Sequence, residues 1–285
     1  MSNGISILQN YRSSLLRMEP YPHFSIDGAL PVSIYEELSR SYPAAEAIFA
    51  HSFRKKDRTM AQNARYDLSS AEIYALPDLP IGAWRDFVYY HTSQEFLDEV
   101  LAKLGDVIYA SYPRLFDVLR RKAPEGRPRA GVRRHSDTAS ECEIALDCQV
   151  GMNSPVTEEN TSVIGPHIDN PKELYAGLFY LRHPEDHSDG GELVIGEWKD
   201  PSRARFREKR YIDDDLVTKR ENIAYAANRF VWLLNGPSSV HGVTPRQRTE
   251  RPRRLCNLIA EVYPTTPRLF DLPARRRGVM FRRRP

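Results

Sequence analysis

The stretch VIGPHIDNPKELYAGLFYL, residues 163–181, decides the fold because it places a polar turn between two short apolar runs. Runs of the same kind recur through the second half of the chain, at 144–150, 192–195, 230–234, 240–243 and 255–263. Many short strands separated by Gly, Pro, Asn and Asp indicate an all-β sandwich or barrel. We therefore expect an antiparallel jelly-roll core of about eight strands. The loop 185–191, EDHSDGG, is predicted to be a hairpin between two of them.

The N-terminal half of the chain predicts helices instead. A short amphipathic helix is expected to begin after Pro31 and to stop at Pro43. A second is expected from Thr92 to Leu104, because TSQE resembles a capping box and Gly105 is suited to the C-terminal end. Residues 51–72 are polar and lack periodicity, which predicts a loop.

These patterns divide the chain into two regions. Residues 1–141 are expected to form a helical N-terminal region that packs on the core. Residues 142–285 are expected to form the core itself, followed by a basic C-terminal tail. A chain of 285 residues can hold both in one compact domain.

Composition excludes several classes of protein. With 41% hydrophobic and 28% charged residues, the chain is neither collagen-like nor of low complexity. It has no apolar run approaching the roughly 18–20 residues of a membrane span, and no signal peptide is recognised. Three cysteines are too few for a disulfide framework, so reduced thiols and a cytoplasmic location are expected. A net charge of +3 does not argue for a nucleic-acid partner.

The candidate chemistry lies in the motif GPHIDNP, residues 165–171. His167 and Asp169 are two positions apart, so on an extended strand both side chains point to the same side. An imidazole and a carboxylate on one face can share a metal ion. His241, which follows the apolar run 230–234, is the best candidate for a third ligand. Two His and one carboxylate form the facial triad of non-heme Fe(II) oxygenases.

A structural interpretation of the same residues stays open. His167 could cap a turn, and Asp169 could form an Asx turn with the following Asn-Pro. His241 could be a satisfied core histidine. The chain would then be a jelly-roll binding module without a metal.

The motifs together resemble those of Fe(II)/2-oxoglutarate-dependent dioxygenases, in the prolyl-4-hydroxylase-like branch. The segments that carry the resemblance are HIDNP at 167–171, LFYL at 178–181, GGEL at 190–193 and HGV at 241–243. The resemblance implies a double-stranded β-helix, also called a cupin-like jelly roll. It implies Fe(II) bound by His167, Asp169 and His241, with 2-oxoglutarate and O2 as cosubstrates, and it allows ascorbate.

The family also needs a cation for the distal carboxylate of 2-oxoglutarate, which would otherwise be a buried, unpaired charge. An arginine can pair such a carboxylate with two hydrogen bonds. Arg253 and Arg254 open the last apolar run and point to opposite faces. We choose Arg254, because Cys256 would then face the same ligand, and we keep Arg253 as the alternative. Tyr180 is the candidate hydroxyl for the same carboxylate.

The resemblance implies hydroxylation of an unactivated C–H bond, with succinate and CO2 as co-products. A small molecule, such as an amino acid or a natural-product intermediate, is the expected substrate. A protein hydroxylase of the prolyl type and a cupin-like metalloenzyme without 2-oxoglutarate are the alternatives. No membrane partner is expected, and base rates allow a homodimer.

The walls of the pocket are expected to come from three variable segments, residues 43–82, 120–140 and 199–222, and from the strand at 144–150. Gln149, Met152 and Asn153 could face cosubstrate or substrate. Arginines of the variable segments would suit an anionic substrate or lie in solvent; they are Arg133, Arg134, Arg203, Arg205 and Arg207.

Overall fold

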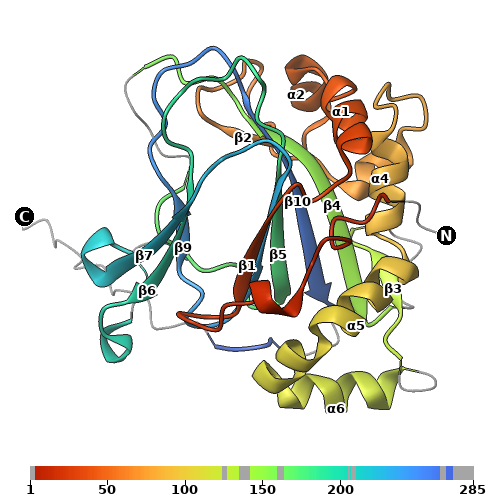
Figure 1. Ribbon diagram of the computed structural model, residues 1–285, viewed down its shortest axis with the longest axis vertical. Helices are drawn as coiled ribbons and strands as arrows, with labels where there is room; N and C mark the ends of the chain where they lie inside the picture. Colours follow the sequence, from red (N-terminus) through yellow and green to blue (C-terminus); the bar gives the residue numbers. More distant parts are fainter. Residues whose placement is uncertain are drawn as a thin grey trace, which may run out of the picture.

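The computed structural model describes residues 4–123, 127–134, 142–158, 164–204, 206, 210–263 and 268–271. Arg205, Arg207 and the basic tail lie outside these ranges. Figure 1 shows three layers: helices on one side, a large sheet in the middle and a small sheet on the other side. The predicted mainly-β jelly-roll core with packed helices is confirmed.

The large sheet follows the order β1-β8-β5-β10-β4-β2, and β3 pairs in parallel with the first three residues of β4. All other pairings in it are antiparallel. Its strands are β1 His23–Asp27, β2 Arg65–Leu68, β3 Ala130–Val132, β4 Ile144–Asn153, β5 Glu173–Tyr180, β8 Arg229–Leu234 and β10 Arg253–Val262. The two ten-residue strands, β4 and β10, pair along their whole length and form its centre.

The small sheet has the order β7-β6-β9 and is antiparallel throughout. Its strands are β6 Leu193–Trp198, β7 Val217–Ile223 and β9 His241–Val243. An apolar cluster joins the two sheets, with Tyr180 and Leu233 from the large sheet against Leu193 and Ile195 from the small one. The site described in the next section lies between these sheets.

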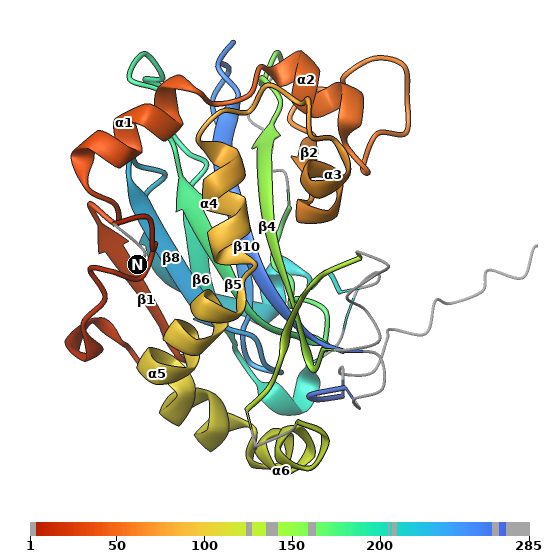
Figure 2. The same ribbon diagram turned by 90° about the vertical axis from the view of Figure 1, so that its right-hand side faces the viewer.

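Helices cover the other face of the large sheet (Figure 2). They are α1 Val32–Arg40, α2 Ala45–His51, α3 Ser70–Ala75, α4 Trp84–His91, α5 Gln94–Ser111 and α6 Pro113–Lys122. Short 3₁₀ turns occur elsewhere, at Ser13–Leu15, Pro201–Arg203 and Asp214–Leu216. The side chains of Phe87 and Phe96 pack here against Phe179 and Leu258 in one continuous core. The described helices include none that is both long enough and apolar enough to cross a bilayer.

Side chains of each central strand alternate between the two faces of the large sheet. On β10, Cys256 and Leu258 belong to the helix-side core, whereas Arg253 and Asn257 line a cavity between the sheets. This alternation follows from the two-residue period of an extended strand. It decides below which of two neighbouring arginines can reach the candidate site.

The structure corrects several local predictions. The helix expected to end at Gly105 continues to Ser111, and its N-cap is Ser93 rather than Thr92. Residues 51–72 contain β2 and the start of α3. The loop 185–191 is not a hairpin turn, because it connects β5 of the large sheet to β6 of the small sheet. The N-terminal region also contributes β1, β2 and β3 to the large sheet, which the helical pattern did not indicate.

Candidate metal centre and its cavity

Main-chain hydrogen bonds bring the three predicted ligands together. The segment carrying His167 and Asp169 runs beside β9, and His167 and His241 form a mutual bridge. The His167 N–H donates to the His241 carbonyl at 2.8 Å, and the His241 N–H donates to the His167 carbonyl at 3.0 Å. One possible ligand atom from each of His167, Asp169 and His241 lies within 4.8 Å of the others. The ligand role itself stays a prediction.

Each imidazole is oriented by a main-chain carbonyl two residues before it. His167 Nδ1 lies 2.9 Å from the Gly165 oxygen, and His241 Nδ1 lies 2.9 Å from the Ser239 oxygen. A carbonyl only accepts, so each Nδ1 carries a proton, and in the neutral imidazole Nε2 then keeps a free lone pair. Those Nε2 atoms lie 3.6 Å and 3.4 Å from the Asp169 carboxylate oxygens. Three donor atoms therefore converge, with tautomers suited to metal binding.

The protonation states of the three groups depend on one another. Burial alone would raise the pKa of Asp169, but His241 and His167 outweigh burial and hold that pKa well below its usual value. Burial, aided by the charge of His241, lowers the pKa of His167. Burial would also lower the pKa of His241, but the Asp169 carboxylate raises it overall. A carboxylate and at least one neutral imidazole are thus present at neutral pH.

The triad opens into a cavity of about 490 Å³ between the two sheets. Its lining includes His167, Asp169 and His241, and also Asn153, Arg253 and Asn257 from β4 and β10. Asn153 and Arg253 are direct partners in the β4–β10 register, so the central strands supply that polar group. The other two residues of β4 that were expected to face a ligand do not line this cavity. Met152 lies in the helix-side core, and the Gln149 side-chain amide donates a hydrogen bond to Asp147.

The structure corrects the choice of arginine. Arg253, only 2% exposed, lines the cavity, whereas Arg254 lies on the helix side and donates to the carbonyls of Leu181 and Ser39. Arg254 does share a face with Cys256, as the sequence indicated, but this is the face that packs on the helices. The placement of Arg254 in the site was therefore wrong, and the alternative, Arg253, is in the cavity.

Arg253 is held in place but incompletely satisfied. Its Nε donates to the Gly191 carbonyl at 2.9 Å, and its Nη1 donates to Asn153 Oδ1 at 3.3 Å. Its Nη2 is buried without a hydrogen-bond partner in the described residues, as are Asn153 Nδ2 and Asn257 Oδ1. Buried polar groups are normally paired, so these orphaned atoms indicate a ligand-binding position.

Tyr180 lies beside this guanidinium. The Arg253 guanidinium carbon is 4.8 Å from the centre of the Tyr180 ring. Burial raises the pKa of Tyr180, and the charge of Arg253 opposes the rise. The hydroxyl is buried, and its interaction with the Arg253 guanidinium falls short of full hydrogen-bond geometry. The side chain is not among those lining the cavity, so its role in binding a ligand stays a prediction.

The glycine pair before β6 permits this arrangement. Gly190 has φ +83°, and a Cβ there would lie 1.9 Å from the Pro245 carbonyl oxygen. Gly191 has φ +75° and brings its carbonyl to Arg253. Only glycine adopts these conformations without strain. The Gly-Gly motif therefore supports the arginine as well as the turn.

Sequence reasoning missed Glu173 and Arg210 in the cavity wall. Burial and the charge of Asp169 raise the pKa of Glu173 to about 7, against the lowering effect of Arg133 and Arg210. Glu173 follows a lysine at the start of an apolar run, and Arg210 is one of several basic residues in the polar segment 203–210. Neither residue shows a periodic or spacing signal that could have found it.

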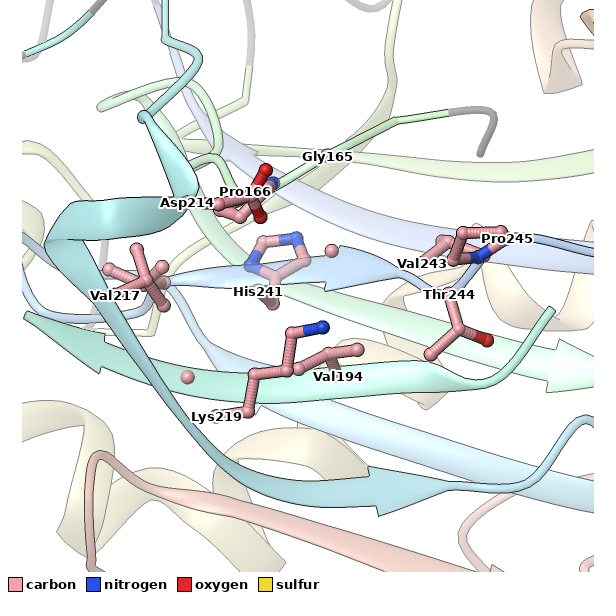
Figure 3. Close-up of a pocket in the computed structure, with 13 residues that line it drawn as sticks. Gly165, Pro166, Val194, Asp214, Val217, Lys219, His241, Val243, Thr244 and Pro245 are labelled. Carbon is pink, nitrogen blue, oxygen red and sulfur yellow. The ribbon is translucent and has the colours of Figure 1, made fainter. Parts of the chain in front are cut away.

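A second pocket, of about 330 Å³, lies beside the small sheet (Figure 3). Figure 3 shows Val217 and Lys219 from β7, Val194 from β6 and His241 from β9 along its wall. Of the triad, only His241 borders this pocket, and its Nε2 approaches Asp169 in the other cavity. The candidate chemistry therefore belongs to the cavity between the sheets.

No protein-family profile and no curated protein matches the chain. Among solved structures, it is similar to a prolyl 4-hydroxylase from Phytophthora capsici, with 13% identity and a TM-score of 0.45 over 85% of this chain and 61% of that one. It is similar to a Pseudomonas putida prolyl-4-hydroxylase, with 12% identity and a TM-score of 0.43 over 84% and 92% of the two chains.

A third similar structure is the epimerase SnoN in complex with Fe3+, alpha ketoglutarate and nogalamycin RO, with 12% identity and a TM-score of 0.40 over 88% of this chain and 85% of that one. This chain spans less than two thirds of the Phytophthora structure. Since identity is low and overlap partial in all three, the function is argued from the geometry of the site.

Proposed function

We propose that the chain is an Fe(II)- and 2-oxoglutarate-dependent oxygenase that hydroxylates an unactivated C–H bond of a small molecule, releasing succinate and CO2. The observation that carries the proposal is one cavity holding the His167–Asp169–His241 triad and the incompletely paired Arg253 guanidinium. A metal site and an anion site in the same cavity suit a ligand that chelates at one end and carries a carboxylate at the other.

The donor set fits Fe(II). Two imidazole nitrogens and one carboxylate on one side of an ion form the facial triad, which leaves other coordination positions open for ligands. His167, Asp169 and His241 would hold the ion, and the Gly165 and Ser239 carbonyls would keep both imidazoles in the binding tautomer. When bound, the iron and the keto acid supply the oxidative chemistry that protein side chains lack.

Arg253 in the cavity wall suits a carboxylate. Its Nη2 is buried without a partner among the described residues, and a carboxylate would satisfy it, whereas a contact of the same ligand with Tyr180 stays a prediction. Gly191 and Asn153 hold the guanidinium from behind, so little side-chain entropy is lost on binding. These residues would bind and orient 2-oxoglutarate, and the packed sheets around them would exclude water.

The test compares the two neighbouring arginines, which point to opposite faces of β10. The affinity of the Mn(II)-loaded protein for 2-oxoglutarate is measured by calorimetry without oxygen, and succinate release is measured with oxygen and Fe(II). We expect Arg253→Gln to weaken 2-oxoglutarate at least about 30-fold, since truncating a buried charge pair costs 2 kcal/mol or more. The matched control, Arg254→Gln, is expected to change that affinity less than about twofold.

Equal affinities in the two variants would contradict the assignment of Arg253. A protein that binds Mn(II) at the triad but neither binds nor consumes the keto acid would instead be a metalloenzyme of another kind. If His167→Ala leaves the metal content unchanged, the triad is structural and the chain is a binding module.

A further inference from the structure

We propose that the substrate of this cavity is an organic acid or an acidic ester, and that Arg210, with Arg134 at the rim, binds its carboxylate or phosphate group. The inference rests on the proposed function, because it names the substrate class for the same cavity. It is carried by the separate observation that two arginines there form no ion pair with an acid among the described residues.

The cavity wall is unusually rich in arginine for a space of about 490 Å³. The charged side chains that line it are Arg54, Arg65, Arg133, Arg134, Arg210, Arg253, Asp169 and Glu173. A positive charge in a partly buried site is costly unless an anion pairs with it. Each buried arginine must therefore be matched with an acid of this chain or with a ligand, and an exposed one is free to contact a ligand.

Three of these arginines already have acid partners. Arg54 and Arg65 both contact the buried Asp67. Arg133 contacts Glu173 at 3.2 Å and Glu261 at 2.5 Å. These pairs build the wall and neutralise the charge of the three arginines, although Arg65 Nη2 stays without a hydrogen-bond partner among the described residues.

Arg253 is the fourth arginine, and the proposed function assigns its open position to the keto acid. It reaches only neutral groups of the chain, the Gly191 carbonyl and the Asn153 amide. The count thus leaves Arg134 and Arg210, which make no ion pair with any acid in the part of the chain that the structure describes.

Arg210 lies next to the metal ligands. Its carbonyl accepts a hydrogen bond from the Ile168 N–H at 3.3 Å, and the adjacent Tyr211 forms a bridge with His167. Its Nη1 is buried without a hydrogen-bond partner in the described ranges. Glu173, whose pKa the charge of Arg210 lowers, is already engaged by Arg133. Arg210 therefore offers a donor into the cavity, close to where the chemistry would occur.

Arg134 marks the outer end of the same wall. Its side chain is exposed, and its guanidinium carbon lies 4.4 Å from the centre of the Phe53 ring, with that of Arg54 at 4.9 Å. Stacking on an aromatic ring leaves the N–H edges of a guanidinium free to donate. A positively charged rim with an inner arginine favours capture and orientation of anions.

The experiment uses the full chain loaded with Mn(II) and saturating 2-oxoglutarate, with benzoate, phenyl phosphate and the neutral benzamide as probes. Calorimetry measures affinity, and enhanced proton relaxation by Mn(II) reports binding near the triad. We expect at least one anion to bind with one site per chain and with enhanced relaxation, and benzamide to bind at least about tenfold more weakly. The ratio of the two anion affinities distinguishes a carboxylate from a phosphate substrate.

Variants separate the two arginines from the general charge of the surface. Arg210→Gln is expected to weaken the preferred anion about tenfold and Arg134→Gln about threefold. Arg210→Lys should retain part of the affinity because it keeps the charge. The matched control is Arg203→Gln, an exposed arginine outside the cavity wall, which should leave anion affinity unchanged.

Failure of the inference is distinct from failure of the proposed function. Any of three results, with 2-oxoglutarate still bound, would overturn the anionic-substrate assignment. Both anions could fail to bind, or benzamide could bind as tightly as they do. In the third result, Arg210→Gln and Arg134→Gln would both leave anion affinity unchanged, as Arg203→Gln does. If 2-oxoglutarate does not bind but benzoate binds and responds to Arg210→Gln, the anion site stands and the oxygenase proposal fails. A response only to Arg253→Gln would place the probe in the keto-acid position and overturn the inference.

Discussion

The two faces of the large sheet are built from the same strands but carry different chemistry. The helix-side face is apolar and continuous, with Phe179, Cys256 and Leu258 packed against α4 and α5. The inner face carries Arg253, Asn257 and Glu173, and several of its polar atoms have no partner among the described residues. The helix-side face therefore carries the larger apolar core, and the inner face combines a smaller apolar cluster with polar groups available to ligands.

Truncation on the helix side should have the largest effect on stability. Phe179 is fully buried and packs against Phe87 and Tyr35, with ring centres 6.0 Å and 6.3 Å away. We expect Phe179→Ala to lower the free energy of unfolding by about 3–5 kcal/mol. Urea unfolding measures this change, and Mn(II) affinity at a temperature where the variant is folded should stay within twofold. A large loss of metal affinity in the folded variant would show that the two faces are not independent.

Truncation on the inner side should show the opposite pattern. Asp169→Ala removes the carboxylate that lies 3.4 Å and 3.6 Å from the two imidazole Nε2 atoms. We expect Mn(II) affinity to fall at least about 100-fold, since one of three ligands is lost. Calorimetric titration measures the affinity, while the circular dichroism spectrum should match that of the unchanged chain. Metal affinity that survives this change would remove the basis of the proposed function.

The inner face should also make stability depend on pH. The pKa of Glu173 is raised to about 7 in the folded chain, above the value of an unfolded carboxyl group. A raised pKa favours the folded state below the unfolded pKa, and this contribution is lost as pH rises toward 7. We expect the stability of the unchanged chain to fall by about 2 kcal/mol, relative to Glu173→Gln, between pH 5 and pH 7.

Urea unfolding of both chains at several pH values measures this difference. Mn(II) should reduce it, because a cation at Asp169 offsets the charge that raises the Glu173 pKa. A difference that is constant with pH would mean that Glu173 stays ionised, held by Arg133.

The sequence was informative where a pattern depends on periodicity. The apolar runs predicted β4, β5, β8 and β10, and the His-x-Asp spacing predicted two side chains on one side, which the structure brings together with His241. The strand period also predicted that Arg253 and Arg254 point to opposite faces. It could not say which face was inside, because Cys256 suits both a helix-packed core and a pocket.

Features that depend on tertiary packing were not predictable. Gly105 is buried inside α5 rather than ending it, since the helix continues through Ile108, which packs in the helix-side core. The strand β7 was missed because most of its residues are polar and show no strand pattern. It is a strand because it pairs with β6, which the sequence alone does not reveal. Arg210 was missed because only the folded structure shows that its Nη1 is buried without a hydrogen-bond partner among the described residues.

The mutual bridge between His167 and His241 has a consequence for redesign. The two positions are joined through peptide groups and not through their side chains. Exchanging either imidazole for another donor, such as a thiolate or a carboxylate, therefore leaves the anchoring bonds in place. Positions 167 and 241 therefore form a backbone-anchored pair. New donor side chains at these positions can alter the preference for one metal over another without changing the surrounding fold.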